Sequence, residues 1–169
     1  MATYRVRIEK EELVFSAAHF ITFAGTVCEA IHGHNYRVRV EWTGPLDDNG
    51  YVVDFIALRD ALRRRVAAWD HHVLLPTRHT MIAVAEAGDE VVVRYTDPDG
   101  VRPAKRWIFP RTDCVLLDIE QTTAELLAAA LAAGLAEELA TIGTPPPERL
   151  VVAVDENAGQ WGVFDTGAA

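Results

Sequence analysis

The sequence has few cysteines, no long apolar run and fewer basic than acidic residues. Two cysteines among 169 residues are too few for a disulfide framework, so we expect a reducing, cytoplasmic location. A net charge of −9 argues against a nucleic-acid partner, because a polyanion would be repelled overall. No segment approaches the roughly 18 consecutive apolar residues of a membrane span, and no apolar signal segment is evident, so no membrane partner is expected.

The hydrophobic patterning predicts one α+β domain over residues 1–169. Alternation predicts a first strand over 4–18, with a bulge near Glu11 and Glu12, and a second over 36–42. Helical spacing of apolar residues predicts a helix over 55–69 behind the N-cap Asp54.

A second helix and a last hairpin follow in the final third of the chain. The helix is predicted to start at Thr122 or Thr123, with Thr122 and Glu125 as a capping box. Strands are predicted over 150–156 and 161–164. This order of elements predicts an antiparallel sheet with helices on one face.

Residues 79–111 have a different pattern and predict an added small sheet within the same domain. The expected strands cover 80–87, 90–95 and 105–109, with turns between them. Such an insert could line a pocket, alter an assembly or decorate the surface. Cys114, which follows it, is expected to be a core residue.

The stretch VCEAIHGHNYRVRV concentrates residues that bind metals. His32 and His34 are two positions apart where a strand begins, so their side chains point to one face. His19 ends the first strand and comes close to them if the two strands pair. Three neutral imidazoles with an open fourth position form a catalytic zinc arrangement. The alternative is ordinary surface or hydrogen-bonded histidines, but half of the six histidines lie between 19 and 34, which favours a metal.

Cys28 lies a few residues before this histidine pair. It could be a fourth metal ligand, a nucleophile, a general base or an inert core thiol. A thiol close to zinc has a lowered pKa and could act as a base near neutrality.

Several spaced motifs together resemble one protein family. The segments FSAAHF, CEAIHGHNY, VVDFIALR, WDHHVL and VDEN occur in the order found in the 6-pyruvoyltetrahydropterin synthase / 6-carboxytetrahydropterin synthase family. The resemblance covers roughly residues 4–75 and 118–165. The C-x3-HGH spacing resembles the 6-carboxytetrahydropterin synthase branch of queuosine and 7-deazapurine biosynthesis.

The resemblance implies a fold, an assembly and a reaction. The fold is the tunnelling fold, an antiparallel four-stranded sheet with two helices on one face. The assembly is a homo-oligomer, a trimer or a dimer of trimers, with active sites at subunit interfaces. The reaction converts 7,8-dihydroneopterin triphosphate to 6-carboxy-5,6,7,8-tetrahydropterin, releasing acetaldehyde and triphosphate.

The resemblance also assigns roles to residues of this sequence. The zinc ligands would be His19, His32 and His34. Cys28 would be the general base, and His71 would shuttle a proton while Asp70 orients it. The pterin would be held by Glu156 and Thr123.

Ordinary structural roles remain open for four of these residues. Asp70 and His71 could form the C-terminal turn of the first helix, where the dipole favours histidine. Thr123 could serve only the start of the second helix. Glu156 shares strand parity with apolar residues, and a carboxylate on an apolar face needs a partner, which favours a ligand role.

Two departures from the family pattern limit what the resemblance implies. The 79–111 segment is longer than the usual link between the first and second helices of the family. The basic residues in or near it could meet the triphosphate or form a solvated charged face. These residues are Arg78, Lys105, Arg106 and Arg111.

The second departure is Glu29, directly after Cys28. CEAIHGH also satisfies the pattern E-x2-HGH of a related branch that gives 6-hydroxymethyldihydropterin for folate synthesis. We expect Cys28 rather than Glu29 to face the ion, since consecutive side chains of an extended segment point to opposite sides. The 6-hydroxymethyl product, the 6-pyruvoyl product and a non-catalytic pterin-binding module remain the alternatives.

Overall fold

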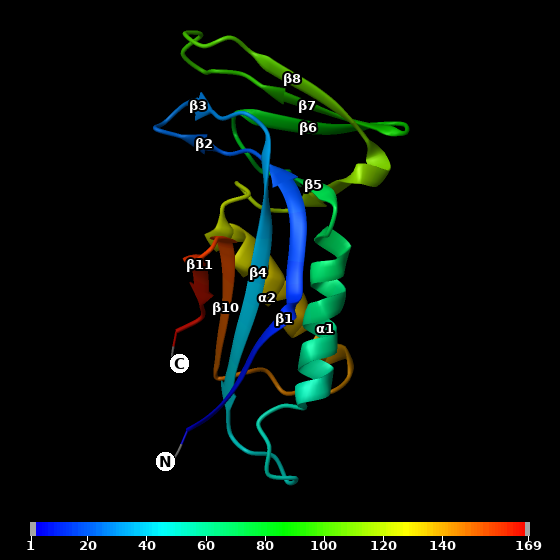
Figure 1. Cartoon of the computed structure of the whole chain (residues 1–169), viewed down its shortest axis with the longest axis vertical. Coiled ribbons are helices and arrows are strands. Elements are labelled where there is room, and N and C mark those ends of the chain that lie inside the picture. The colour runs from blue at the N-terminus through cyan, green and yellow to red at the C-terminus, as the bar shows by residue number, and fades with distance from the viewer. Residues whose placement is uncertain (1–2, 168–169) are drawn as a thin grey trace.

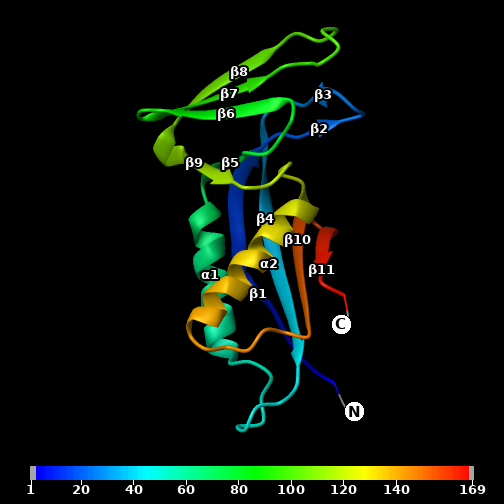
Figure 2. The ribbon, with the colours of Figure 1, turned by 180° about the vertical axis from the view of Figure 1, so that it is seen from behind.

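The computed structural model describes residues 3–167, so residues 1–2 and 168–169 at the ends of the expected domain lie outside it. A long sheet is backed by two helices and crossed at one end by a second, smaller sheet (Figures 1 and 2). The long sheet has the strand order β11-β10-β4-β1-β5-β9. No helix of the described part of the chain has the length and apolar character to cross a membrane.

The centre of the sheet is the antiparallel pair of β1 (Tyr4–His19) and β4 (His32–Gly44). Their register shifts between Glu9 and Val14, which confirms the predicted bulge. On the other side of β4 come β10 (Arg149–Asn157) and β11 (Gln160–Asp165), both antiparallel to their neighbours. The predicted four-stranded antiparallel sheet is therefore confirmed.

Two further strands extend the sheet beyond β1, and sequence patterning missed both. β5 (His72–Pro76) runs parallel to β1, and β9 (Cys114–Leu117) runs parallel to β5. Each is a short apolar run without alternation, which does not distinguish a buried strand from other buried segments. Cys114 is buried, as expected.

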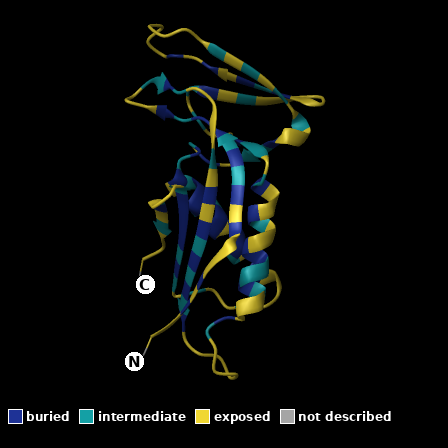
Figure 3. Ribbon diagram, in the orientation of Figure 1, coloured by how far each residue is buried: buried dark blue, intermediate teal, exposed yellow. Residues whose placement is uncertain are grey.

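Both helices cover the same face of the sheet, which is toward the viewer in Figure 2. α1 (Phe55–Trp69) begins where predicted, and the Asp54 carboxylate accepts hydrogen bonds from the backbone N–H groups of Ile56 and Ala57 at 2.7 and 3.2 Å. The core lies between the helices and the alternate residues of β1, β4 and β10 that face them, which gives these strands their striped burial in Figure 3.

The predicted capping box of α2 (Ala124–Thr141) is wrong. The N-cap is Thr123, and within the described residues its side chain makes no capping hydrogen bond. Thr122 is fully buried, and its hydroxyl donates to the carbonyl of Phe20 at 3.3 Å. The Thr122 hydroxyl therefore ties the end of β1 to the helix instead of capping it.

The insert forms a three-stranded antiparallel sheet of β6 (Ile82–Ala87), β7 (Glu90–Tyr95) and β8 (Lys105–Pro110), which confirms the predicted small sheet. A 3-10 turn, η1 (Arg111–Asp113), leads from it to β9. The insert lies across the end of the long sheet, next to the short hairpin of β2 (Thr22–Phe23) and β3 (Val27–Cys28) (Figure 1). A second apolar cluster joins insert and hairpin, and it contains Phe20, Cys28, Leu75, Ile82, Val91, Val93, Tyr95 and Cys114.

Candidate metal and pterin site

The pairing of β1 with β4 brings the three predicted zinc ligands together. His19 lies directly opposite His32, and Ala17 lies opposite His34. All three histidines share the strand parity of the core residues, so their imidazoles are on the helix face beyond the end of the core. Gly33 permits this approach, because a Cβ there would lie 3.1 Å from the carbonyl oxygen of Ala17.

The Nε2 atoms of His19 and His32 lie 3.2 Å apart, and a ring nitrogen of His34 lies close to them. One ligand atom from each of the three histidines lies within 4.8 Å of the others. Nδ1 of His19 is 2.8 Å from the carbonyl oxygen of Thr122, and Nδ1 of His32 is 3.1 Å from that of Ala30. A carbonyl oxygen only accepts, so these Nδ1 atoms carry the hydrogens and the Nε2 lone pairs are left for a metal.

The third histidine, His34, also has a ring nitrogen available for an ion. Its Nε2 is buried and has no hydrogen-bond partner anywhere in residues 3–167. Burial also lowers the pKa of the His34 imidazole, which favours the neutral form that binds metals. An unpaired buried nitrogen is costly unless something occupies the space it faces. The residues therefore fit a metal ion held by His19, His32 and His34.

Glu156 of β10 lies beside the histidines on the same face. Its Oε1 is 3.2 Å from Nε2 of His19 and 3.7 Å from Nε2 of His34. When no ion is bound and His19 carries a hydrogen on Nε2, its hydrogen bond is the main reason that the pKa of Glu156 lies below its ordinary value, and the nearby histidines add to the effect. A bound metal would take the Nε2 lone pair instead. The predicted need of this carboxylate for a partner is met at the edge of the cluster.

Tyr36 is a neighbour of the cluster that sequence reasoning did not single out. Its ring stacks on Phe15 and lies 5.5 Å from that of His34, centroid to centroid. The hydroxyl is buried and without a hydrogen-bond partner in the part of the chain that the structure describes. Its position two residues after His34, on the same strand face, is the signal that could have identified it.

Cys28 and Glu29 point in different directions, and not as expected. The Cys28 thiol is buried in the apolar cluster under the insert and lies 3.6 Å from the carbonyl oxygen of Glu29. Burial raises its pKa, although the charge of Lys105 acts in the opposite direction. The Glu29 carboxylate accepts a hydrogen bond from the backbone N–H of Ile21 at 2.7 Å and lies 3.7 Å from Nδ1 of His32. In this structure the glutamate, not the cysteine, contacts a cluster histidine.

Asp70 and His71 form a pair that belongs to the other face of the sheet. Oδ2 of Asp70 is 2.8 Å from Nδ1 of His71, and its Oδ1 accepts from the backbone N–H of Ser16 at 2.7 Å. This amide is the main reason that the pKa of Asp70 lies below its ordinary value, and His71 adds to the effect. The His71 side chain is 80% exposed, and its backbone is left-handed with φ of 60°.

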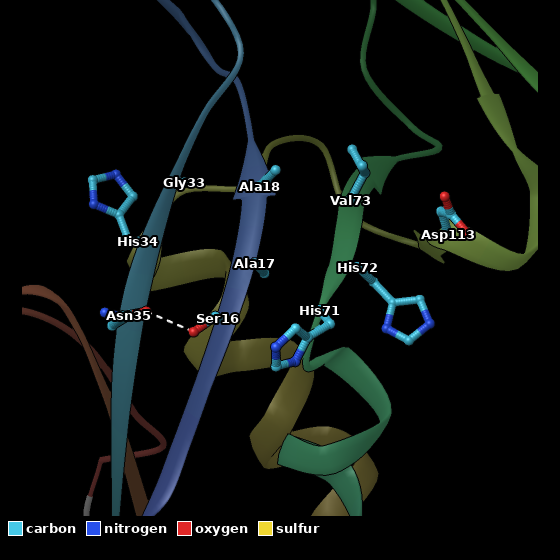
Figure 4. Close-up of a pocket in the computed structure, with 10 residues that line it drawn as sticks. All are labelled: Ser16, Ala17, Ala18, Gly33, His34, Asn35, His71, His72, Val73 and Asp113. Atoms are coloured by element: carbon cyan, nitrogen blue, oxygen red, sulfur yellow. Dashed lines mark hydrogen bonds between the residues drawn. The ribbon is translucent and has the colours of Figure 1, made fainter.

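A cavity of about 510 Å³ opens in front of this pair. Ser16, Asn35 and His71 line it, with Ala17, Ala18, Gly33, His34, His72, Val73 and Asp113. Figure 4 shows the imidazoles of His34 and His71 on different sides of the β1–β4 pair, with the strands between them. One chain therefore brings the three histidines and Glu156 together, but it does not bring His71 to them.

The remaining candidates have mostly structural partners. Arg78 pairs with Asp118 at 3.4 Å and with Glu120 at 3.0 Å, and Arg111 pairs with Glu86. Arg106 is exposed. Thr123 is partly exposed next to Thr122, whose carbonyl receives the His19 hydrogen bond. This places Thr123 beside the cluster without assigning it a contact.

The fold and the histidine cluster together are those of a family of pterin enzymes. The model of the family described as 6-pyruvoyl tetrahydropterin synthase matches residues 7–166, so the chain belongs to this family. Its members include lyases acting on pterins. A Methanocaldococcus jannaschii protein with the provisional name 6-carboxy-5,6,7,8-tetrahydropterin synthase is 31% identical over 153 residues, which is 90% of this chain and 89% of the relative.

Solved structures show the same fold. The 6-pyruvoyltetrahydropterin synthase of Plasmodium vivax is 28% identical to this chain with a TM-score of 0.83, and the alignment covers 99% of each chain. Variants of that enzyme in which a catalytic glutamate is replaced by alanine or by cysteine match equally well.

Proposed function

We propose that this chain is a zinc-dependent lyase that converts 7,8-dihydroneopterin triphosphate to 6-carboxy-5,6,7,8-tetrahydropterin, releasing acetaldehyde and triphosphate. The observation that carries the proposal is the convergence of the three histidines, with the unpartnered Nε2 of His34 among them. The provisional name of the M. jannaschii relative supports this product. The proposed pathway, queuosine or 7-deazapurine biosynthesis, is the one that the family resemblance implies.

Each candidate residue has a distinct chemical role in the proposed reaction. Bound zinc would supply a Lewis acid next to the side-chain oxygens of the substrate. The Glu156 carboxylate can accept two N–H groups from the 2-amino-4-oxo edge of the pterin. Cys28 is the proposed base, and its side chain must turn out of the apolar cluster that now buries the thiol. His71, held by Asp70, carries the proton to or from the product.

The proposed site is complete only with a second copy of the chain. His71 is exposed on the face opposite the histidine cluster, beside a cavity large enough for a ligand. A neighbouring copy placed on this face would add its His71 to the cluster of another chain. The proposed assembly is the one that the family resemblance implies, a trimer or a dimer of trimers with sites at subunit interfaces.

A second candidate function uses Glu29 as the base and gives 6-hydroxymethyldihydropterin. Two observations favour it: the Glu29 carboxylate lies 3.7 Å from His32, and a catalytic glutamate is replaced in the P. vivax variants. The 6-pyruvoyl product and a pterin-binding module without turnover remain alternatives on the same scaffold.

The test is an anaerobic incubation of zinc-loaded protein with 7,8-dihydroneopterin triphosphate, followed by identification of the pterin by mass. We expect the 6-carboxy product with acetaldehyde, lost in Cys28→Ala and retained in Glu29→Gln. A 6-hydroxymethyl product that is lost in Glu29→Gln would establish the second candidate. Pterin binding without any product would refute both.

A further inference from the structure

Lys105 makes an unusual contact with the segment that carries the two candidate bases. It is the first residue of β8, and its Nζ donates to the backbone carbonyl oxygens of Cys28 at 2.5 Å and of Glu29 at 3.0 Å. In a regular strand, consecutive carbonyls point to opposite sides. Here both converge on one ammonium group, so the backbone turns at this point and the ammonium stabilises the turn.

The rest of the insert holds the same segment along its length. Trp107, two residues after Lys105, stacks on Phe20 with ring centroids 4.4 Å apart. The Tyr95 hydroxyl donates to the carbonyl of Thr26, and Arg102 donates to the Thr26 hydroxyl at 2.5 Å. The insert therefore contacts the 20–31 segment near both of its ends and in its middle.

The positions of these side chains follow from the alternation of β8. Lys105, Trp107 and Phe109 are partly buried, whereas Arg106 and Ile108 are exposed on the other face. Trp107 and Phe109 pack against the same apolar cluster that contains Cys28. Lys105 thus belongs to the inner face of the insert, although its charge alone would suggest a solvated surface residue.

The direction of the Cys28 and Glu29 side chains depends on the peptide between them. Fixing both carbonyls fixes that peptide, which sends the thiol into the apolar cluster and the carboxylate toward Ile21 and His32. The backbone N–H of Glu29 also donates to the carbonyl of Ile21 at 3.1 Å, which closes the loop at its base. A change at Lys105 would therefore reach both candidate bases without touching the histidines.

We propose that Lys105 is a positioning residue of the active site, and that the inserted sheet is the brace that sets the orientation of the Cys28–Glu29 segment for turnover. The proposal rests on the proposed function. With Glu29 as the base, the orientation held by Lys105 is the productive one; with Cys28 as the base, the thiol turns about its own side-chain bond while Lys105 holds the backbone. The role of the 79–111 segment would then be to position the Cys28–Glu29 segment, rather than to line a pocket or decorate the surface.

The test compares Lys105→Met with Lys105→Arg and with Arg94→Met, a matched control at an exposed position of the neighbouring strand β7. Hydrogen exchange, measured by mass spectrometry, should be about tenfold faster over residues 26–31 in Lys105→Met, because hydrogen bonds from a charged donor are lost. kcat should fall by about tenfold or more with KM changed by less than about threefold, because orientation rather than binding is lost. Lys105→Arg should restore part of both, and Arg94→Met should match the wild type.

Three outcomes would contradict the inference: unchanged exchange in Lys105→Met, faster exchange with unchanged kcat, or a change in KM alone. If Lys105→Met fails to fold, as judged by circular dichroism, Lys105→Gln retains a neutral, shorter donor group and should give a partial effect of the same kind. If the wild-type protein gives no pterin product, the proposed function fails first. Turnover in the wild type with an unaffected Lys105→Met variant refutes the inference alone.

Discussion

At the end of the sheet nearest the insert, the two faces carry different chemical groups. The helix face holds three histidines, among which the Nε2 of His34 is buried and unpartnered within residues 3–167. The opposite face holds His71, which is exposed and already hydrogen-bonded to Asp70. Buried lone pairs that converge suit a small ion, whereas an exposed imidazole suits a group brought by another molecule. This difference supports the proposal of two half-sites, one for an ion and one completed by a second copy of the chain.

The strongest test of this difference separates metal binding from proton transfer. We expect His34→Ala to lose bound zinc and to lower turnover on the order of a thousandfold or more, since it removes a metal ligand. His71→Ala should also lower turnover, by about a hundredfold or more, but should keep its zinc. Metal content by plasma mass spectrometry and product formation by mass check both variants. Zinc loss in His71→Ala would abolish the distinction between the faces.

A mixing experiment tests whether the two half-sites come from different copies. His34→Ala and His71→Ala, refolded together in equal amounts, should recover about a quarter of wild-type activity, the fraction of interfaces that pair an intact half of each kind. The control is a mixture of the two variants that has not been allowed to exchange subunits. If activity stays at the level of the single variants, each chain works alone and the interfacial site is wrong.

The Asp70 carboxylate should also affect how the stability of the folded protein depends on pH in the acidic range. The Ser16 amide, and next His71, hold its pKa below the ordinary value, so the folded state favours the ionised form. Its stabilising contribution is complete above the unfolded pKa of about 4 and is lost as pH falls through the lower folded value. As the pH is lowered below about 4, the free energy of unfolding, measured by urea titration, should therefore fall less in Asp70→Asn than in the wild type. Asp48→Asn, at an exposed loop position, is the control, and equal acid sensitivity in Asp70→Asn would contradict the argument.

The smallest expected effects compare the starts of the two helices. Asp54→Ala should destabilise the protein by about 1 kcal/mol, because Asp54 caps α1 with two hydrogen bonds. Thr123→Ala should change stability far less, since the Thr123 side chain makes no capping bond among the described residues. If Thr123 contacts the pterin beside the histidine cluster, this variant raises KM instead. Equal losses of stability in the two variants, measured by urea unfolding, would exclude the difference in capping.

The sequence predicted most of the fold because its central strands alternate cleanly. His32, His34 and Tyr36 continue the same parity as the apolar residues of β4, so the face that carries the histidines followed from the pattern alone. β5 and β9 were missed because short apolar runs have no period to detect.

The orientation of Cys28 could not be predicted from its own neighbourhood in the sequence. It depends on Lys105, which lies 77 positions away and reaches the segment only because the insert packs over it. The separation of His71 from the histidine cluster was equally hidden. It follows from the turn between α1 and β5 and from a strand, β5, that the pattern did not show.

The left-handed backbone of His71 has a consequence for engineering a more thermostable form of this protein. A side chain in that conformation costs on the order of 1 kcal/mol relative to glycine, which adopts it freely. Selecting substitutions only for lower backbone strain would therefore favour His71→Gly, which should raise the thermal stability of the protein. It would also delete the imidazole on which the proposed proton transfer depends, so tolerance to heat and catalytic competence compete at a single residue.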